Sequence, residues 1–105
     1  MKDLTDDMQA LRQAFIHYLR IHEQYARPDI MASNVLYSCR HDIGMPFAAI
    51  FVSNASMQRA RELLTAHFET IGRKDPKRHA GVHYGCWVKF REFLIASGRR
   101  PEPST

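Results

Sequence analysis

The stretch VHYGCWVKFREFLIASG, residues 82–98, predicts the last helix of the chain and its main contribution to a core. Large apolar side chains recur in it at helical spacing, so they share one face. These residues are Val82, Trp87, Phe90 and Leu94, with Cys86 and Phe93 beside them. We expect Gly98 to end the helix and Trp87 to anchor the core.

The segment before this stretch predicts a third long helix. Ser53 or Asn54 is suited to cap its first turn, and Gly72 is suited to end it. The apolar stripe between them consists of Met57, Ala60, Leu64, Phe68 and Ile71. We interpret the charged residues of this segment, among them Arg59 and Arg61, as an ordinary solvated face.

Two further helices are expected nearer the N-terminus. A second helix starts at Pro28, ends at Gly44 and has an apolar stripe of Met31, Val35, Cys39 and Ile43. A first helix of about 20 residues starts near Leu4 and stops before Pro28. Its stripe is Leu4, Met8, Leu11, Phe15 and Tyr18, continued by His22 and Tyr25.

Residues 45–52, MPFAAIFV, are too short and too apolar for periodicity to assign, and we expect a short helix or an extended plug under the bundle. The predicted fold is therefore all-α, a single compact bundle of four to five helices. Its domain covers residues 1–98, and residues 99–105 form a flexible basic and proline-containing tail. A length of 105 residues suits one domain.

Composition narrows the class of protein. The longest apolar run near the middle, residues 46–52, is far shorter than the roughly 20 residues that cross a bilayer, so a membrane span is excluded. The acidic first residues do not resemble a secretory signal. The only two cysteines, Cys39 and Cys86, have neither the number nor the spacing of a disulfide framework or a four-ligand zinc site, which favours reduced thiols. We expect a cytoplasmic protein.

Positive charge is concentrated in the last third of the chain. Residues 1–72 contain seven Lys and Arg and eight acids, a net of −1 (7 − 8), whereas residues 73–100 contain eight Lys and Arg and two acids, a net of +6 (8 − 2). The most basic stretch is the proline-containing connector RKDPKRH at residues 73–79. Such clustering favours a polyanionic or acidic partner.

Lys and Arg side chains in such a cluster can lie against phosphates, with nonspecific or shape-guided contact expected because no base-reading side chains are evident. The predicted nucleic-acid-binding residues are Arg73, Lys74, Lys77, Arg78, His79, His83, Lys89, Arg99 and Arg100. Tyr84 is the one aromatic residue near this cluster that is a candidate for exposure.

The chain contains no complete catalytic motif. His79, His83 and Cys86 have the i, i+4, i+7 spacing of zinc ligands on a helix, but further phosphate or solvent contacts are the favoured interpretation of the two histidines. Asp29 and the later Asp75-Pro76-Lys77 match a magnesium nuclease only loosely, because no sheet joins them. Cys86 with His83 lacks an orienting third group. We expect no enzyme activity, no metal and no cofactor.

Residues 83–94, HYGCWVKFREFL, resemble the last helix of the core-binding, SAM-like domain of tyrosine recombinases and related integrases. In that helix a Tyr-x-x-x-Leu-x-x-Phe-x-x-Phe-Leu pattern packs the bundle. A looser similarity covers residues 33–64, and Trp87 stands where the family has an aliphatic residue. The resemblance implies a helical module that grips DNA from one side, without the separate catalytic domain.

Two functional hypotheses follow. The first is a small non-catalytic module that binds nucleic acid, DNA in preference to RNA, through the C-terminal basic patch. The alternative is an adaptor or inhibitor, of the kind carried by mobile elements, that docks on an acidic protein or nucleoprotein surface. Phe47, Ile50 and Phe51 would serve that alternative if they were exposed. A homodimer through the first helix is a further alternative.

Overall fold

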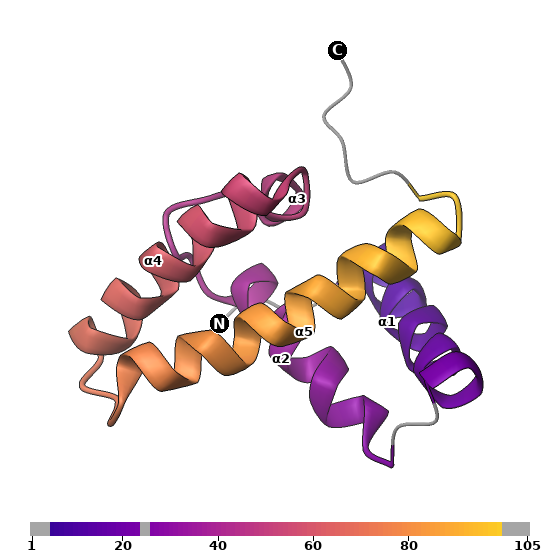
Figure 1. The fold of residues 1–105 in the computed structure, drawn as a ribbon, viewed down its shortest axis with the longest axis horizontal. Helices are drawn as coiled ribbons and strands as arrows, with labels where there is room; N and C mark the ends of the chain where they lie inside the picture. Colours follow the sequence, from indigo (N-terminus) through magenta and orange to yellow (C-terminus); the bar gives the residue numbers. More distant parts are fainter. Residues whose placement is uncertain (1–4, 24–25, 100–105) are drawn as a thin grey trace.

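Helix α5 (Pro76–Ala96) passes through the middle of the molecule and packs against α1, α2 and α4 (Figure 1). The computed structural model describes residues 5–23 and 26–99. In chain order the elements are α1 (Asp6–Tyr18), the π-helical turn η1 (Leu19–Glu23), α2 (Pro28–Arg40), α3 (Phe47–Ile50), α4 (Asn54–Thr70) and α5. Within these described ranges there is no strand. The predicted all-α bundle is confirmed.

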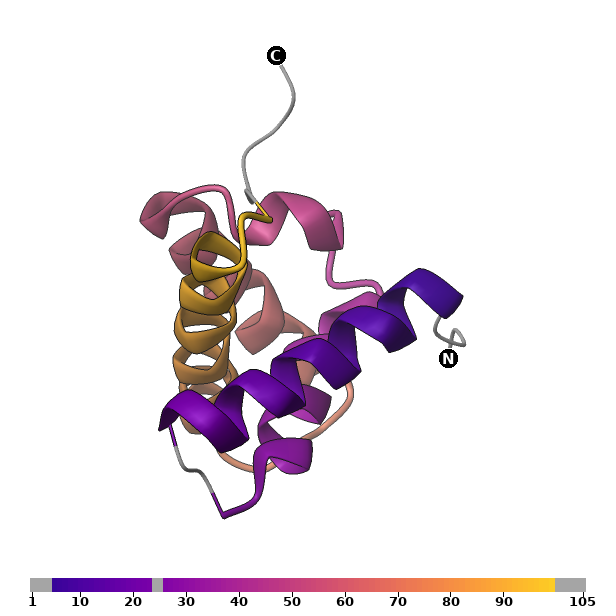
Figure 2. The same cartoon turned by 90° about the vertical axis from the view of Figure 1, so that its right-hand side faces the viewer.

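Aromatic side chains on one face of α5 form the centre of the core. Trp87 is 0% exposed, as its place in the apolar stripe predicts. Phe90 makes edge contacts with Phe15 of α1 and with Phe51, at ring-centroid distances of 5.0 and 4.9 Å. Figure 2 shows α1 crossing α5 rather than running along it. Helix α5 therefore joins α1 to the segment around α3 through aromatic contacts.

The short middle segment is a helix, α3, which resolves the two alternatives that the sequence left open. Ile50, its last residue, and Phe51, which follows it, are buried. The guanidinium of Arg91 donates from Nε to the carbonyl of Phe51 at 2.9 Å and from Nη2 to that of Val52 at 3.5 Å. These bonds satisfy carbonyls that the end of a short helix leaves without partners, and they tie α3 to α5.

Several boundaries and burial predictions were wrong. Helix α5 begins at Pro76, because proline's fixed φ suits the first helical position, so residues 77–79 are helical and are not part of a connector. Ile71 and Val82 are each 52% exposed. Ile71 comes after the last residue of α4, and Val82 lies beside the buried row of Ala80, His83 and Trp87. Cys39 is only half-buried.

The first helix keeps only part of its predicted stripe and changes its winding. Leu11 and Tyr18 are half-buried, and the core also takes Ile16 and Leu19, which were not predicted for the stripe. Phe15, Ile16 and Leu19 are buried, while the chain widens into a π-helical turn at Leu19. The extra residue in such a turn shifts the stripe. His22 is therefore exposed, and its ring lies tilted beside that of Tyr18, with the ring centroids 4.9 Å apart. Leu4 and Tyr25, also predicted for this stripe, lie outside the described residues.

Gly85 provides a test of the packing around α5. It lies in the middle of this helix, and a Cβ added there would meet nothing within 4 Å. Gly85→Ala should raise the free energy of unfolding by about 1 kcal/mol, because alanine loses less backbone entropy in a helix. Urea denaturation of both proteins measures this difference. A loss of stability would contradict the open space above Gly85.

Candidate nucleic-acid interface

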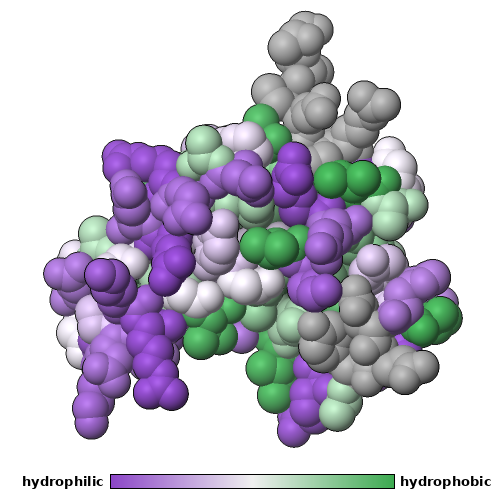
Figure 3. Space-filling model, viewed as in Figure 1, coloured by the Kyte–Doolittle hydropathy of each residue, from purple (hydrophilic) through white to green (hydrophobic). Residues whose placement is uncertain are grey.

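Four exposed cations gather where α4 passes into α5. Arg73 and Lys74 lie in the connecting turn, and Lys77 and Arg78 lie in the first turn of α5. We call these four residues the basic turn. Figure 3 shows hydrophilic side chains projecting from this end of the molecule. The predicted patch therefore has a compact centre of four residues.

Backbone geometry holds the basic turn in place. Gly72 has a φ of +75°, which closes α4, and the Arg73 amide donates to the carbonyl of Phe68 at 2.9 Å. Asp75 has a φ of +51° and its side chain does not cap α5. The first turn of α5 contains no acidic residue. The positive end of the helix dipole thus adds to the charges of Lys77 and Arg78.

Arg73 is fixed by the core as well as by the turn. Its guanidinium carbon lies 4.4 Å from the ring centroid of Phe68 and 5.8 Å from that of Tyr37. The Tyr37 hydroxyl lies 3.2 Å from Nε2 of His67, and its ring stacks on His41 at 4.3 Å. A cation of the basic turn therefore rests on aromatic side chains of α2 and α4.

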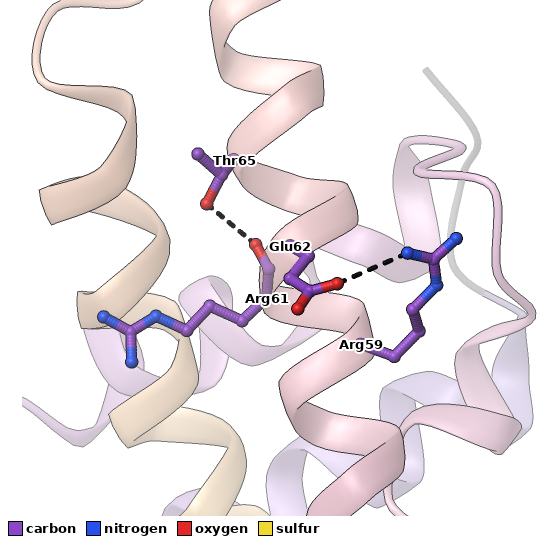
Figure 4. A network of polar contacts seen from close by, with 4 residues as sticks. All are labelled: Arg59, Arg61, Glu62 and Thr65. Carbon is purple, nitrogen blue, oxygen red and sulfur yellow. Dashed lines mark hydrogen bonds and ion pairs between the residues drawn. The ribbon is translucent and has the colours of Figure 1, made fainter.

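A shallow cavity of about 630 Å³ lies beside the basic turn, between α4 and α5. Its lining consists of Arg61, Thr65, Glu69, Asp75, Pro76, Lys77 and Arg78. Figure 4 shows Arg61 reaching from α4 toward α5, whereas Arg59 points the other way and pairs with Glu62 at 3.3 Å. Spacing along the sequence places Arg61 on the same solvated face as Arg59, and only the position of Arg61 opposite α5 distinguishes the two residues.

Two predicted contacts lie away from the basic turn. Lys89 comes 11 residues after Arg78 on α5, which is about 16 Å along a helix, and it forms an ion pair with Glu92 at 3.3 Å. Arg99 follows the other end of α5 and lies over Phe93 at 5.4 Å. Arg100 and the rest of the predicted tail lie outside the described residues. Lys89 and Arg99 are thus separated from the basic turn by much of the length of α5.

The two predicted histidines face inward. His83 is 6% exposed, and its Nδ1 donates to the carbonyl of Asn34 at 2.8 Å, which joins α5 to α2. His79 is half-buried, and its ring lies 6.3 Å from that of Phe68. A buried side chain already bonded to the backbone does not reach a phosphate, so we remove His83 from the candidate contacts. His79 lies at the edge of the candidate phosphate-binding surface.

The surroundings of Cys86 do not favour zinc binding by α5. His79, His83 and Cys86 all lie on the helix, but the side-chain amide of Asn34 donates to Sγ of Cys86 at 3.8 Å. Burial raises the pKa of the Cys86 thiol, which opposes the thiolate form that binds zinc. In the described part of the chain, no three His, Cys, Asp or Glu side chains are grouped as metal ligands.

Comparison of the chain with protein-family models, curated proteins and solved structures finds no match. None of the described helices is long and apolar enough to span a membrane.

The environment of His83 predicts a pH dependence of stability. Burial lowers its pKa from the usual 6.5, more than the bond to Asn34 raises it, and the nearby charges of Arg73 and His79 lower it further. Below about pH 6.5 the unfolded chain therefore binds more protons than the folded protein, and the free energy of unfolding falls as pH falls. Urea unfolding at pH 7.5 and 5.5 measures this loss.

His83→Gln should reduce the pH dependence, because glutamine does not titrate. His17→Gln, at an exposed position of α1, is the matched control and should keep the wild-type dependence. An unchanged slope in His83→Gln would contradict the assignment.

Proposed function

We propose that this protein binds nucleic acid, duplex DNA in preference to RNA, through the basic turn and without catalysis. The observation that carries the proposal is the concentration of four exposed cations that have no carboxylate within ion-pair distance among the described residues. Elsewhere Arg27, Arg59 and Lys89 are each paired with an acid. Unpaired cations on a fixed backbone are suited to phosphate contact.

The proposed mode of binding is contact with the phosphate backbone from one side. The basic turn is formed by the ends of two helices, and its long side chains extend from a rigid base. Each phosphate that it neutralises releases counterions, which supplies affinity independent of base sequence. The preference for DNA rests on the resemblance of residues 83–94 to the core-binding domain of tyrosine recombinases.

The alternative protein-docking function has less support. Ile50 and Phe51, two of the three residues that would have formed an exposed apolar cluster, are buried, and Phe47 is half-buried against Phe51. The large apolar side chains that are exposed come from several elements: Ile21, Ile30, Ile71, Val82 and Ile95. The basic turn therefore supports a nucleic-acid partner more strongly than the exposed apolar residues support a protein partner.

Replacing all four residues of the basic turn with alanine should abolish the gel shift of a generic DNA duplex. The four side chains are exposed, so the helical circular dichroism should be unchanged. The matched control replaces Arg12, Arg20, Arg27 and Arg59 with alanine, which removes the same charge from other surfaces and should leave most of the binding. Equal binding by both variants would exclude the basic turn as the contact site.

The salt dependence of wild-type binding provides an independent test. With three to four phosphates neutralised, the logarithm of the association constant should fall linearly with the logarithm of salt concentration, with a slope of about −3 to −4. Fluorescence anisotropy of a labelled duplex at several salt concentrations measures this slope. Affinity that persists in concentrated salt would contradict phosphate-based binding.

A further inference from the structure

Arg61 occupies a position that its neighbours define closely. Its side chain is half-buried and crosses from α4 to the backbone of α5 (Figure 4). Its Nη2 atom lies 3.1 Å from the point where a Cβ of Gly81 would be. Its guanidinium carbon lies 5.4 Å from the ring centroid of Tyr84. Packing against a glycine and an aromatic ring thus holds the guanidinium in place.

The guanidinium of Arg61 nevertheless has no hydrogen-bond acceptor or carboxylate partner among residues 5–23 and 26–99. Arg59, two positions earlier on the same helix, is more exposed and pairs with Glu62. An arginine has five N–H donors in a planar fork that matches phosphate oxygens. Because Arg61 lines the cavity between α4 and α5, its donors are available at a site where the side chain is already ordered.

We propose that Arg61, together with Lys77 and Arg78, binds one phosphodiester group of a nucleic-acid backbone in this cavity, and that Gly81 is the residue that allows Arg61 to reach it. This inference rests on the proposed function and specifies its ligand. The basic turn attracts the polyanion, and the cavity fixes one phosphate of it. A fixed guanidinium loses less side-chain entropy on binding than a flexible one.

The charge of the cavity favours a phosphodiester over a more highly charged group. Its lining contains three cations, Arg61, Lys77 and Arg78, and two carboxylates, Glu69 and Asp75, a net of +1 (3 − 2). A phosphodiester carries a single negative charge, which this net charge balances. A terminal phosphate or a polyphosphate would place additional negative charge beside the two carboxylates.

The position of the Arg61 guanidinium depends on the absence of a side chain at Gly81, which lies on the neighbouring helix. An alanine Cβ at 3.1 Å from Nη2 would be tighter than an ordinary contact, so the guanidinium would have to move by a few tenths of an ångström. Gly85, one turn further along α5, has nothing within 4 Å of its Cβ position. A glycine-to-alanine substitution can therefore be made in the same helix both at a position that contacts Arg61 and at a position that contacts nothing.

The first experiment compares Gly81→Ala with Gly85→Ala. Neither should lower the thermal stability, because alanine is favoured over glycine within a helix. Gly81→Ala should weaken binding of a short DNA duplex about threefold, since it shifts the Arg61 guanidinium by a few tenths of an ångström from its place beside the phosphate, whereas Gly85→Ala should bind like the wild type. Equal affinities of the two variants would overturn the role of Gly81.

The second experiment compares Arg61→Ala with Arg59→Ala, which remove the same charge from one helix. Arg61→Ala should weaken duplex binding about tenfold, and Arg59→Ala about twofold or less because it loses only long-range attraction. Arg61→Lys should fall between Arg61→Ala and the wild type, since it keeps the charge and loses the fork. Equal losses in Arg61→Ala and Arg59→Ala would show that the cavity holds no phosphate.

A dinucleoside monophosphate separates this inference from the proposed function. It contains one phosphodiester, and its titration should shift the amide NMR signals of Gly81 and Lys77 in the wild type but not in Arg61→Ala. Such shifts in a protein that fails to bind duplex would keep the phosphate site and overturn the proposed function. Duplex binding without these shifts would keep the function and overturn the phosphate site.

Discussion

Burial of the aromatic face of α5 is the interaction on which the rest of the structure depends. Trp87 and Phe90 are almost fully enclosed, and the helices that enclose them come from both halves of the chain. This packing fixes the direction of α5, and with it the position of its first turn relative to α4. Buried residues of the core thereby determine where the basic turn lies on the surface.

The core and the charged surface are coupled through a few side chains. Arg73 rests on Phe68 and Tyr37, and His83 connects α5 to the backbone of α2. Burial lowers the pKa of His83, and the positive charge of Arg73 lowers it further. Acid that protonates this histidine acts against the same packing that supports the turn. Stability of the fold and geometry of the basic turn are therefore linked physically.

Helical periodicity identified each of the long helices, because a buried face requires apolar residues at that spacing whatever the partner helix is. Periodicity was less accurate in predicting the first and last residues of the helices. Ile71 fitted the spacing of α4 but comes after its last residue, and residues 77–79 looked like a connector because they are polar. Polar residues in the first turn of a helix have no apolar neighbours to mark them. Pro76 was the available signal for this start.

The sequence by itself determined the all-α class, most of the apolar residues that form the core and the concentration of positive charge after residue 72, since these depend on composition and on spacing along one chain. Only the tertiary structure decided which charges lie together. It separated Lys89 and Arg99 from the basic turn, turned His83 inward and set Arg61 opposite Gly81. Contacts between helices depend on the rotation and crossing of each pair, and no periodicity within a single helix specifies these.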